Sequence, residues 1–159
     1  MLIRKATAEE MLALWGYGDA DIATPTARFF YRNISSGNTV FWTADNDGDL
    51  IGELYVFYDL DDKDFADGSS TAYLCAFRVR EEFRGQGIGT RMMEEALADL
   101  RAAGFLNATI GVDDERNERM YRRMGFNAWV KDCYWDPCAM DDALQPAEDE
   151  GFILLSKKL

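Results

Sequence analysis

Three glycines, Gly85, Gly87 and Gly89, separate an apolar segment from an amphipathic one, and they constrain the fold more than any other feature of the sequence. The apolar segment, TAYLCAFRV at residues 71–79, carries apolar residues on both of its alternating faces, which predicts a central strand. The segment after the glycines repeats apolar residues at helical spacing as far as about Ala103. A glycine lowers helix stability by about 1 kcal/mol relative to alanine, so the cluster predicts a loop between strand and helix.

A loop of this kind is suited to bind an anion. The first amide groups of a helix have no intrahelical partner and lie at the positive end of the helix dipole, and glycines let the backbone approach a phosphate closely. Two nucleotide-binding motifs do not fit. The Walker loop ends in Gly-Lys-Ser/Thr, where this chain has Gly89-Thr90-Arg91, and the dinucleotide fingerprint is G-x-G-x-x-G after a first strand. The loop instead matches R-x-x-G-x-G, beginning at Arg84.

The remaining segments predict one domain over residues 1–159, in the order β-α-α-β-β-β-α-β-α-β-β. Thr7 and Glu10 form a capping box at the start of the first helix, and Thr24 and Gly37 mark the two ends of the second. The other helices run from the glycines to about residue 103 and over 115–124. The expected strands are 2–6, 39–44, 50–58, 71–79, 106–112, 126–130 and 151–157, with a long irregular segment at 132–150 before the last one.

The composition excludes several function classes. The chain has no histidine, so it contains neither a Ser–His–Asp hydrolase triad nor a Cys/His zinc site. Three cysteines do not suffice for a four-cysteine zinc site, and we expect no metal. A net charge of −12 argues against nucleic-acid binding, because phosphate backbones require a basic surface.

The same residues bear on the location of the protein. No apolar run approaches the roughly 20 residues that span a bilayer, and the N-terminal residues do not form an apolar signal segment. We therefore expect a cytoplasmic protein without membrane partners. A Cys133–Cys138 disulfide is compatible with the spacing, but a cytoplasmic location favours reduced thiols.

Two segments resemble the signatures of one family, the GNAT superfamily of GCN-related N-acetyltransferases. FRVREEFRGQGIGTRMMEEAL, at 77–97, is similar to the acyl-CoA-binding signature of that family, and DERNERMYRRMGF, at 114–126, is similar to its N-x-x-A-x-x-L-Y-x-x-x-G-F helix. The resemblance extends over nearly the whole chain. It implies an α+β fold of three layers, with a mixed, mostly antiparallel sheet of about seven strands flanked by about four helices. It also implies acetyl-CoA as the acyl donor and an amine as the acceptor.

The resemblance assigns contacts to the cofactor. The backbone at the end of the central strand, Phe77, Arg78 and Val79, would pair with the pantetheine arm, and the Val79 amide would polarise the thioester carbonyl. The backbone amides of the loop would hold the pyrophosphate, and the loop residues are Arg84, Gly85, Gln86, Gly87, Ile88, Gly89 and Thr90.

The second signature departs from the family pattern at two positions. Asp114 stands in place of the asparagine, where we interpret it as a helix N-cap. Asn117 stands in place of the small alanine, and it either hydrogen-bonds the pantetheine or crowds it. Arg122 and Arg123 either contact the 3′-phosphate of the cofactor or are solvated on the helix surface.

Tyr121 falls where the family has the tyrosine that protonates the departing CoA thiolate. A phenol titrates near 10 and a thiol near 8.5, so Tyr121 would be protonated at neutral pH and could act as general acid. The alternative is an aromatic residue of the core beneath the sheet.

The general base is less clearly marked, because the central strand has no carboxylate. Glu53 on the preceding strand is the best single candidate, ahead of Glu81, Glu82 and Asp113. Strand alternation predicts that Glu53 shares a face with Ile51 and Tyr55. Glu53 then either reaches the cleft, directly or through water, or is an ordinary surface acid.

The acidic balance suggests which amine is acetylated. Carboxylates gather at 59–67 and 132–150, which favours a cationic acceptor such as a polyamine, an amino sugar or a basic peptide, although solvated surface charge is the simpler interpretation. The alternative function is a non-catalytic acyl-CoA-binding sensor or interaction module, and a nucleotide-phosphate binder ranks below both. The aromatic-rich closing strands and the segment CYWDPCAM, at 133–140, could supply a homodimer surface.

Overall fold

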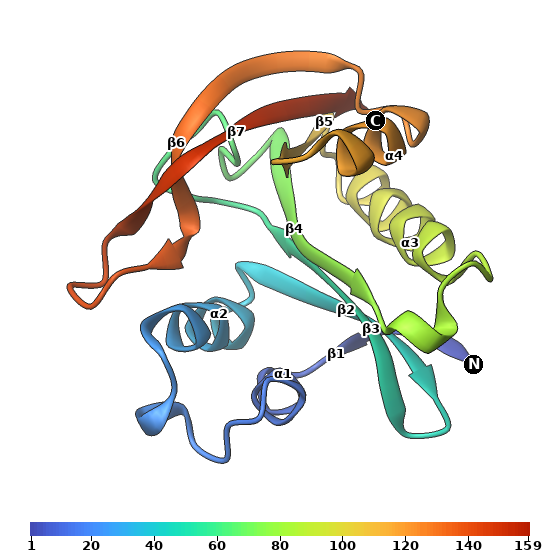
Figure 1. Ribbon diagram of the computed structural model, residues 1–159, viewed down its shortest axis with the longest axis vertical. Helices are drawn as coiled ribbons and strands as arrows, with labels where there is room; N and C mark the ends of the chain where they lie inside the picture. The colour runs from blue at the N-terminus through green and yellow to red at the C-terminus, as the bar shows by residue number, and fades with distance from the viewer.

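One mixed sheet of seven strands runs through the molecule, and the computed structural model describes residues 1–159 (Figure 1). The strand order is β1-β2-β3-β4-β5-β7-β6, and only β4 and β5 pair in parallel. This architecture confirms the predicted α+β fold and the predicted order of elements. The elements are β1 (Leu2–Ala6), α1 (Ala8–Leu14), η1 (Ala20–Ile22), α2 (Pro25–Ser36), β2 (Thr39–Asn46), β3 (Asp49–Phe57), β4 (Thr71–Val79), η2 (Glu81–Phe83), α3 (Ile88–Ala102), β5 (Asn107–Val112), α4 (Glu115–Arg123), β6 (Ala128–Met140) and β7 (Pro146–Lys158).

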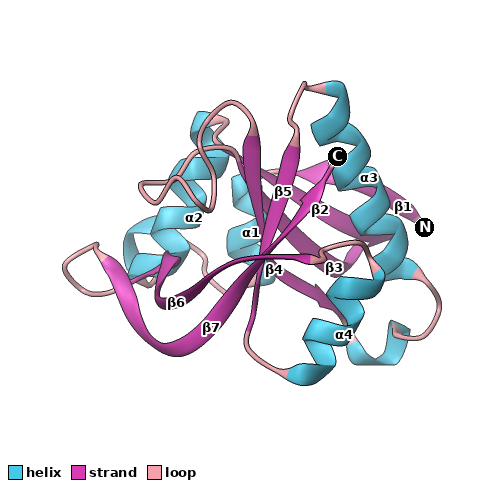
Figure 2. Cartoon of the chain, turned by 90° about the horizontal axis from the view of Figure 1, so that it is seen from above, coloured by secondary structure: helices cyan, strands magenta, loops and turns pink.

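The four α-helices cover both faces of the sheet. α1 and α2 lie on one face, and α3 and α4 lie on the other (Figure 2). On β3, Leu54 and Val56 pack in the cluster that includes α3, whereas Tyr55 and Phe57 pack in the cluster that includes α1 and α2. Because both faces are covered, every residue of β3 from Ile51 to Phe57 is buried. No helix combines the length and the hydrophobicity of a membrane-spanning segment.

The ends of α1 and α2 lie where their capping residues predict them. Thr7 and Glu10 form the capping box of α1, and the Thr24 side chain accepts a hydrogen bond from the Ala27 amide at the start of α2. These side-chain oxygens satisfy amide groups that have no partner inside the helix. Gly37 ends α2 in the left-handed conformation, with φ +84°. The predictions for both helices are confirmed.

The prediction of an irregular segment at 132–150 is wrong. β6 and β7 form a long antiparallel hairpin that bends over α2, where the Met140 amide donates a hydrogen bond to Thr26 Oγ1 at 3.0 Å (Figure 1). Three register shifts interrupt the pairing, so apolar and polar residues do not alternate regularly along β6. Pro137 is tolerated because β6 is an edge strand of the sheet. The two cysteines of β6 are free thiols.

Candidate active site

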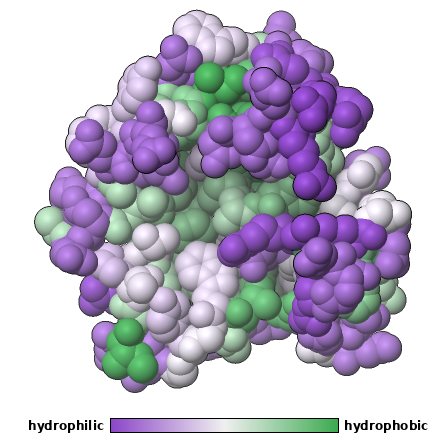
Figure 3. Space-filling model, viewed as in Figure 1, coloured by the Kyte–Doolittle hydropathy of each residue, from purple (hydrophilic) through white to green (hydrophobic).

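β4 and β5 lie side by side over only the first half of β4. Thr71–Leu74 pair with Asn107–Ile110, and from Cys75 onward β4 is paired with β3 alone. The two parallel strands therefore separate and leave one backbone edge of β4 free. Figure 3 shows a hollow in this part of the molecule, floored by hydrophobic residues and bordered by hydrophilic ones.

A bulge bends β4 where it leaves β5. Cys75 is opposite Tyr55 and Arg78 is opposite Glu53, so β4 has one more residue than β3 between these two pairs. Ala76, inside the bulge, has φ +50°, a left-handed conformation that costs a non-glycine residue roughly 1–2 kcal/mol. No glycine marks the position, so the sequence carries no signal for this bulge.

The backbone of Val79 faces the opening between the strands. The Arg80 amide donates to the Ile51 carbonyl at 2.8 Å, so residue 80 faces β3 and, by antiparallel alternation, residue 79 faces the other way. The Val79 carbonyl accepts a hydrogen bond from Arg84 Nε at 2.7 Å. The side chain of Arg84 therefore holds the glycine loop against the end of β4.

The glycine loop presents a row of free hydrogen-bond donors. None of the six consecutive amides from Gly85 to Thr90 has an acceptor in the protein, and the first bond of α3 runs from the Arg91 amide to the Gly87 carbonyl at 3.1 Å. Gly85 and Gly87 adopt left-handed conformations, with φ +79° and +78°. Free amides at the positive end of a helix of 15 residues form a cradle for an anion.

Gly89 lets this cradle lie close to β4. A Cβ atom at position 89 would lie 3.0 Å from Cζ of Phe77 and 3.5 Å from Cγ2 of Val79. A larger residue would require the Phe77 ring or the start of α3 to shift by a few tenths of an ångström. The third glycine thus allows the free amides to lie close to the free edge of β4.

Tyr121 on α4 is placed beside the same strand. Its ring centroid lies 6.4 Å from that of Phe77 and 6.3 Å from that of Phe126, and the residue is 7% exposed. Burial, with a smaller contribution from the charge of Asp113, raises the pKa of Tyr121 to about 12. Tyr121 is therefore both a packed aromatic residue and a phenol that stays protonated at neutral pH.

Glu53 is a buried carboxylate and not a surface acid. It is 7% exposed, and its Oε1 accepts hydrogen bonds from Trp15 Nε1 at 3.3 Å and from Arg78 Nη2 at 2.8 Å. These bonds leave Oε2 without a partner. The predicted alignment holds for Tyr55 but is wrong for Ile51, which packs in the opposite cluster because the register with β2 shifts at this point.

The other predicted acids are less suited to act as a base. Glu81 and Glu82 lie exposed on η2, and Glu82 is within 3.7 Å of Arg80. Asp113 follows β5 and is close enough to Tyr121 to raise the pKa of that phenol. Of the four predicted carboxylates, only Glu53 is buried.

Several side chains of the second signature bond to other groups at or within α4. Asp114 is the N-cap of α4, as predicted, and accepts hydrogen bonds from the Asn117 amide at 2.7 Å and from Asn117 Nδ2 at 3.2 Å. Arg122 pairs with Glu118 at 2.9 Å. Asn117 is thus tied to the start of the helix, while Arg123 makes no ion pair with the chain.

An acidic cavity of about 420 Å³ lies between the start of α4 and the β6–β7 hairpin. Asp113, Asp132 and Glu150 line it without a basic partner, and Tyr134 and Phe152 add aromatic surface. Asp113 also contributes to the raised pKa of Tyr121. The sequence indicated the acidic segments, but it did not predict that these three carboxylates line one cavity.

Comparison with known families gives one match. The model of the family described as Acetyltransferase (GNAT) family matches residues 5–126. No curated protein sequence matches the chain.

Comparison with solved structures gives the same fold. A GNAT family acetyltransferase from Elizabethkingia anophelis with acetyl-CoA bound is 16% identical, with a TM-score of 0.62, and the match covers 99% of this chain and 97% of that one. The aminoglycoside 6′-N-acetyltransferase from Enterococcus faecium is 14% identical, with a TM-score of 0.66 and the same coverage. The ribosomal-protein-alanine N-acetyltransferase from Brucella melitensis is 17% identical, with a TM-score of 0.65, over 100% of both chains.

Proposed function

Because the chain belongs to the acetyltransferase (GNAT) family and is an acyl-CoA-dependent acyltransferase, we propose that it transfers an acetyl group from acetyl-CoA to an amine. The observation that carries this proposal is the row of six free amides from Gly85 to Thr90 beside the free edge of β4. Free amides at a helix start suit a diphosphate, and an unpaired strand edge suits the amide-rich pantetheine arm. The acetyl-CoA complex of the similar Elizabethkingia protein agrees with this donor.

The binding residues have separate roles in this proposal. The amides from Gly85 to Thr90 donate hydrogen bonds to the diphosphate, whereas the Arg84 amide, which the sequence also assigned to this role, is bonded to the Glu81 carbonyl at 3.1 Å. The backbone of Phe77, Arg78 and Val79 pairs with the pantetheine. The Val79 amide faces the opening, where it stabilises the negative charge that develops on the thioester oxygen. Asn117 borders the same arm from α4.

The two reacting residues come from opposite faces of the sheet, with Glu53 beside Trp15 of the α1/α2 cluster and Tyr121 in the cluster that includes α3. Glu53 Oε2, free of protein partners, accepts a proton from the acceptor ammonium through water. The neutral amine attacks the thioester carbonyl directly, in a ternary complex, and the C–S bond breaks as the new amide forms. Tyr121 donates its proton to the departing thiolate. Both acid and base act without histidine, which the chain lacks.

The acceptor in this proposal is cationic. Asp113, Asp132 and Glu150 are unpaired carboxylates around one cavity, and they attract a second positive charge on an amine substrate. A polyamine, an amino sugar and a basic peptide all carry such a charge.

Release of CoA thiol from acetyl-CoA, measured against a panel of amines, tests this function. We expect kcat/KM to be highest for spermidine, an aminoglycoside or a lysine-rich peptide, to be lowest for glutamate, and to fall as salt screens the carboxylates. Binding of acetyl-CoA without thiol release for any amine would contradict the proposal and favour an acyl-CoA-binding module.

Replacement of Glu53 by glutamine is expected to lower kcat at pH 7 by roughly 10²–10⁴-fold, because a general base is lost while the shape of the site is kept. The deficit should shrink as the pH approaches the pKa of the acceptor ammonium, where the amine no longer needs a base. Glu81→Gln, an exposed carboxylate nearby, is the matched control and should change little. An E53Q deficit that is the same at every pH would contradict the assigned role.

A further inference from the structure

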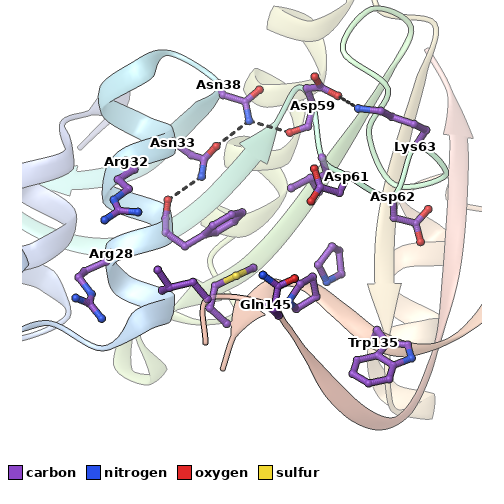
Figure 4. A pocket seen from close by; sticks show the side chains of 16 residues that line it. Arg28, Arg32, Asn33, Asn38, Asp59, Asp61, Asp62, Lys63, Trp135 and Gln145 are labelled. Carbon is purple, nitrogen blue, oxygen red and sulfur yellow. Dashed lines mark hydrogen bonds and ion pairs between the residues drawn. The ribbon is translucent and has the colours of Figure 1, made fainter. Parts of the chain in front are cut away.

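One cavity of the molecule lies apart from the residues assigned to acetyl transfer. It has a volume of about 800 Å³ and lies between α2, the 59–63 loop and the tip of the β6–β7 hairpin. None of its lining residues is among those assigned to cofactor binding or catalysis above. Figure 4 shows Arg28 and Arg32 on one side of this cavity, with Gln145 and Trp135 across from them.

Two guanidinium groups beside the cavity have no acidic partner. Arg28 and Arg32 are four residues apart on α2 and therefore lie on one face of the helix. Neither forms an ion pair, although the chain holds 29 acidic residues against 17 basic ones. Arg28 Nε is shielded from solvent and makes no hydrogen bond. Such a donor is costly to leave unsatisfied, and the pair presents uncompensated positive charge to the cavity.

The opposite wall does not neutralise this charge. Lys63 is paired with Asp59 at 2.6 Å, and Lys131 is paired with Asp62 at 2.6 Å. Asp61 remains as an unpaired carboxylate on that wall. It repels a second negative group there, so an anion in the cavity would direct its charge toward α2.

Part of the lining between the two walls is apolar. Trp135 is 58% exposed and offers an open indole face, and Met140 and Pro137 of the same strand continue the apolar surface. Phe29 of α2, stacked on Phe57 at 5.7 Å between ring centroids, forms part of the lining. An aromatic or aliphatic group is buried favourably against such a surface.

We propose that this cavity binds a small amphipathic monocarboxylate, with the carboxylate held by Arg28 and Arg32 and the apolar part against Trp135 and Met140. Arginine suits this ligand because its planar fork matches the two oxygens of a carboxylate. The cavity contains no group assigned to acetyl transfer, so the ligand is bound there and is not acetylated.

Isothermal titration of the full chain with 3-phenylpropanoate tests the proposal, with 3-phenylpropanamide as the neutral probe of equal shape. We expect saturable binding of the carboxylate and at least tenfold weaker binding of the amide, because a charge-assisted hydrogen bond is lost. Saturating CoA should leave the binding unchanged. Equal affinity for both probes, displacement by CoA, or no saturation up to about 10 mM would overturn the proposal.

Two variants assign the binding to this cavity. Arg28→Gln with Arg32→Gln should weaken 3-phenylpropanoate binding at least tenfold, while Arg101→Gln with Lys158→Gln removes the same charge elsewhere and should not. Thiol release with the best amine confirms that the R28Q/R32Q chain is folded. W135A should weaken both probes through the loss of apolar contact. Unchanged carboxylate binding in R28Q/R32Q and in W135A would place the probe elsewhere and overturn the proposal.

Discussion

Replacement of Tyr121 by phenylalanine is expected to lower kcat by roughly 10²–10⁴-fold while the affinity for acetyl-CoA stays the same. The substitution removes only the hydroxyl proposed to donate a proton to the thiolate, and general acids contribute on this scale. The ring keeps its packing against Phe77 and Phe126, so the site keeps its shape. Steady-state thiol release and acetyl-CoA titration measure the two quantities separately.

The pH profile of the wild-type enzyme sharpens this prediction. Burial raises the pKa of Tyr121 to about 12, so its proton is present throughout the range in which an acceptor amine becomes neutral. Turnover should therefore rise with pH as the amine deprotonates, and it should decline through loss of this proton only as the pH approaches 12. Tyr58→Phe is the matched control, because it also removes a phenol hydroxyl from a half-buried tyrosine, whose ring stacks on that of Phe105. Equal turnover of Y121F and wild type would remove Tyr121 from the mechanism.

Replacement of both Gly85 and Gly87 by alanine is expected to weaken acetyl-CoA binding roughly a hundredfold. Both residues have positive φ, where alanine costs roughly 1–2 kcal/mol, or about tenfold for each position. The new methyl groups would also stand beside the amides proposed to bind the diphosphate. Isothermal titration with acetyl-CoA measures the loss.

Substitution of two other glycines is the control that distinguishes a loss of acetyl-CoA binding from a general loss of stability through backbone strain. Gly16 and Gly104 have φ +85° and +91°, and a Cβ added at either position would have no neighbouring atom within 4 Å, as at Gly85 and Gly87. G16A/G104A should therefore lose comparable stability but keep its acetyl-CoA affinity. If the two double variants bound acetyl-CoA equally well, the loop would not be the diphosphate site.

Local signals predicted the central unit of the fold well. The strand expected at 71–79 is β4 with the same bounds, because its apolar run and the glycines that follow are both local features. The α4 N-cap at Asp114 is local as well. The β6–β7 hairpin was missed because its acidic residues and Pro137 are unfavourable in most strands, and only its edge position makes them acceptable.

The candidate site depends on contacts that no local pattern contains. The burial of Glu53 requires Trp15, 38 positions before it, and Arg78, 25 positions after it. The bulge at Ala76 is imposed by pairing with β3 and by the departure from β5. Sequence reasoning could therefore name Glu53 as a carboxylate near the cleft but could not decide whether it was buried.

β6 contributes residues to both of the cavities described above. Tyr134 lines the acidic cavity and its neighbour Trp135 lines the larger one, because consecutive residues of a strand point to opposite faces. A shift of this strand would therefore move residues of both cavities. Thermodynamic linkage makes any such effect mutual: occupancy on one side would change affinity on the other by the same factor in either direction.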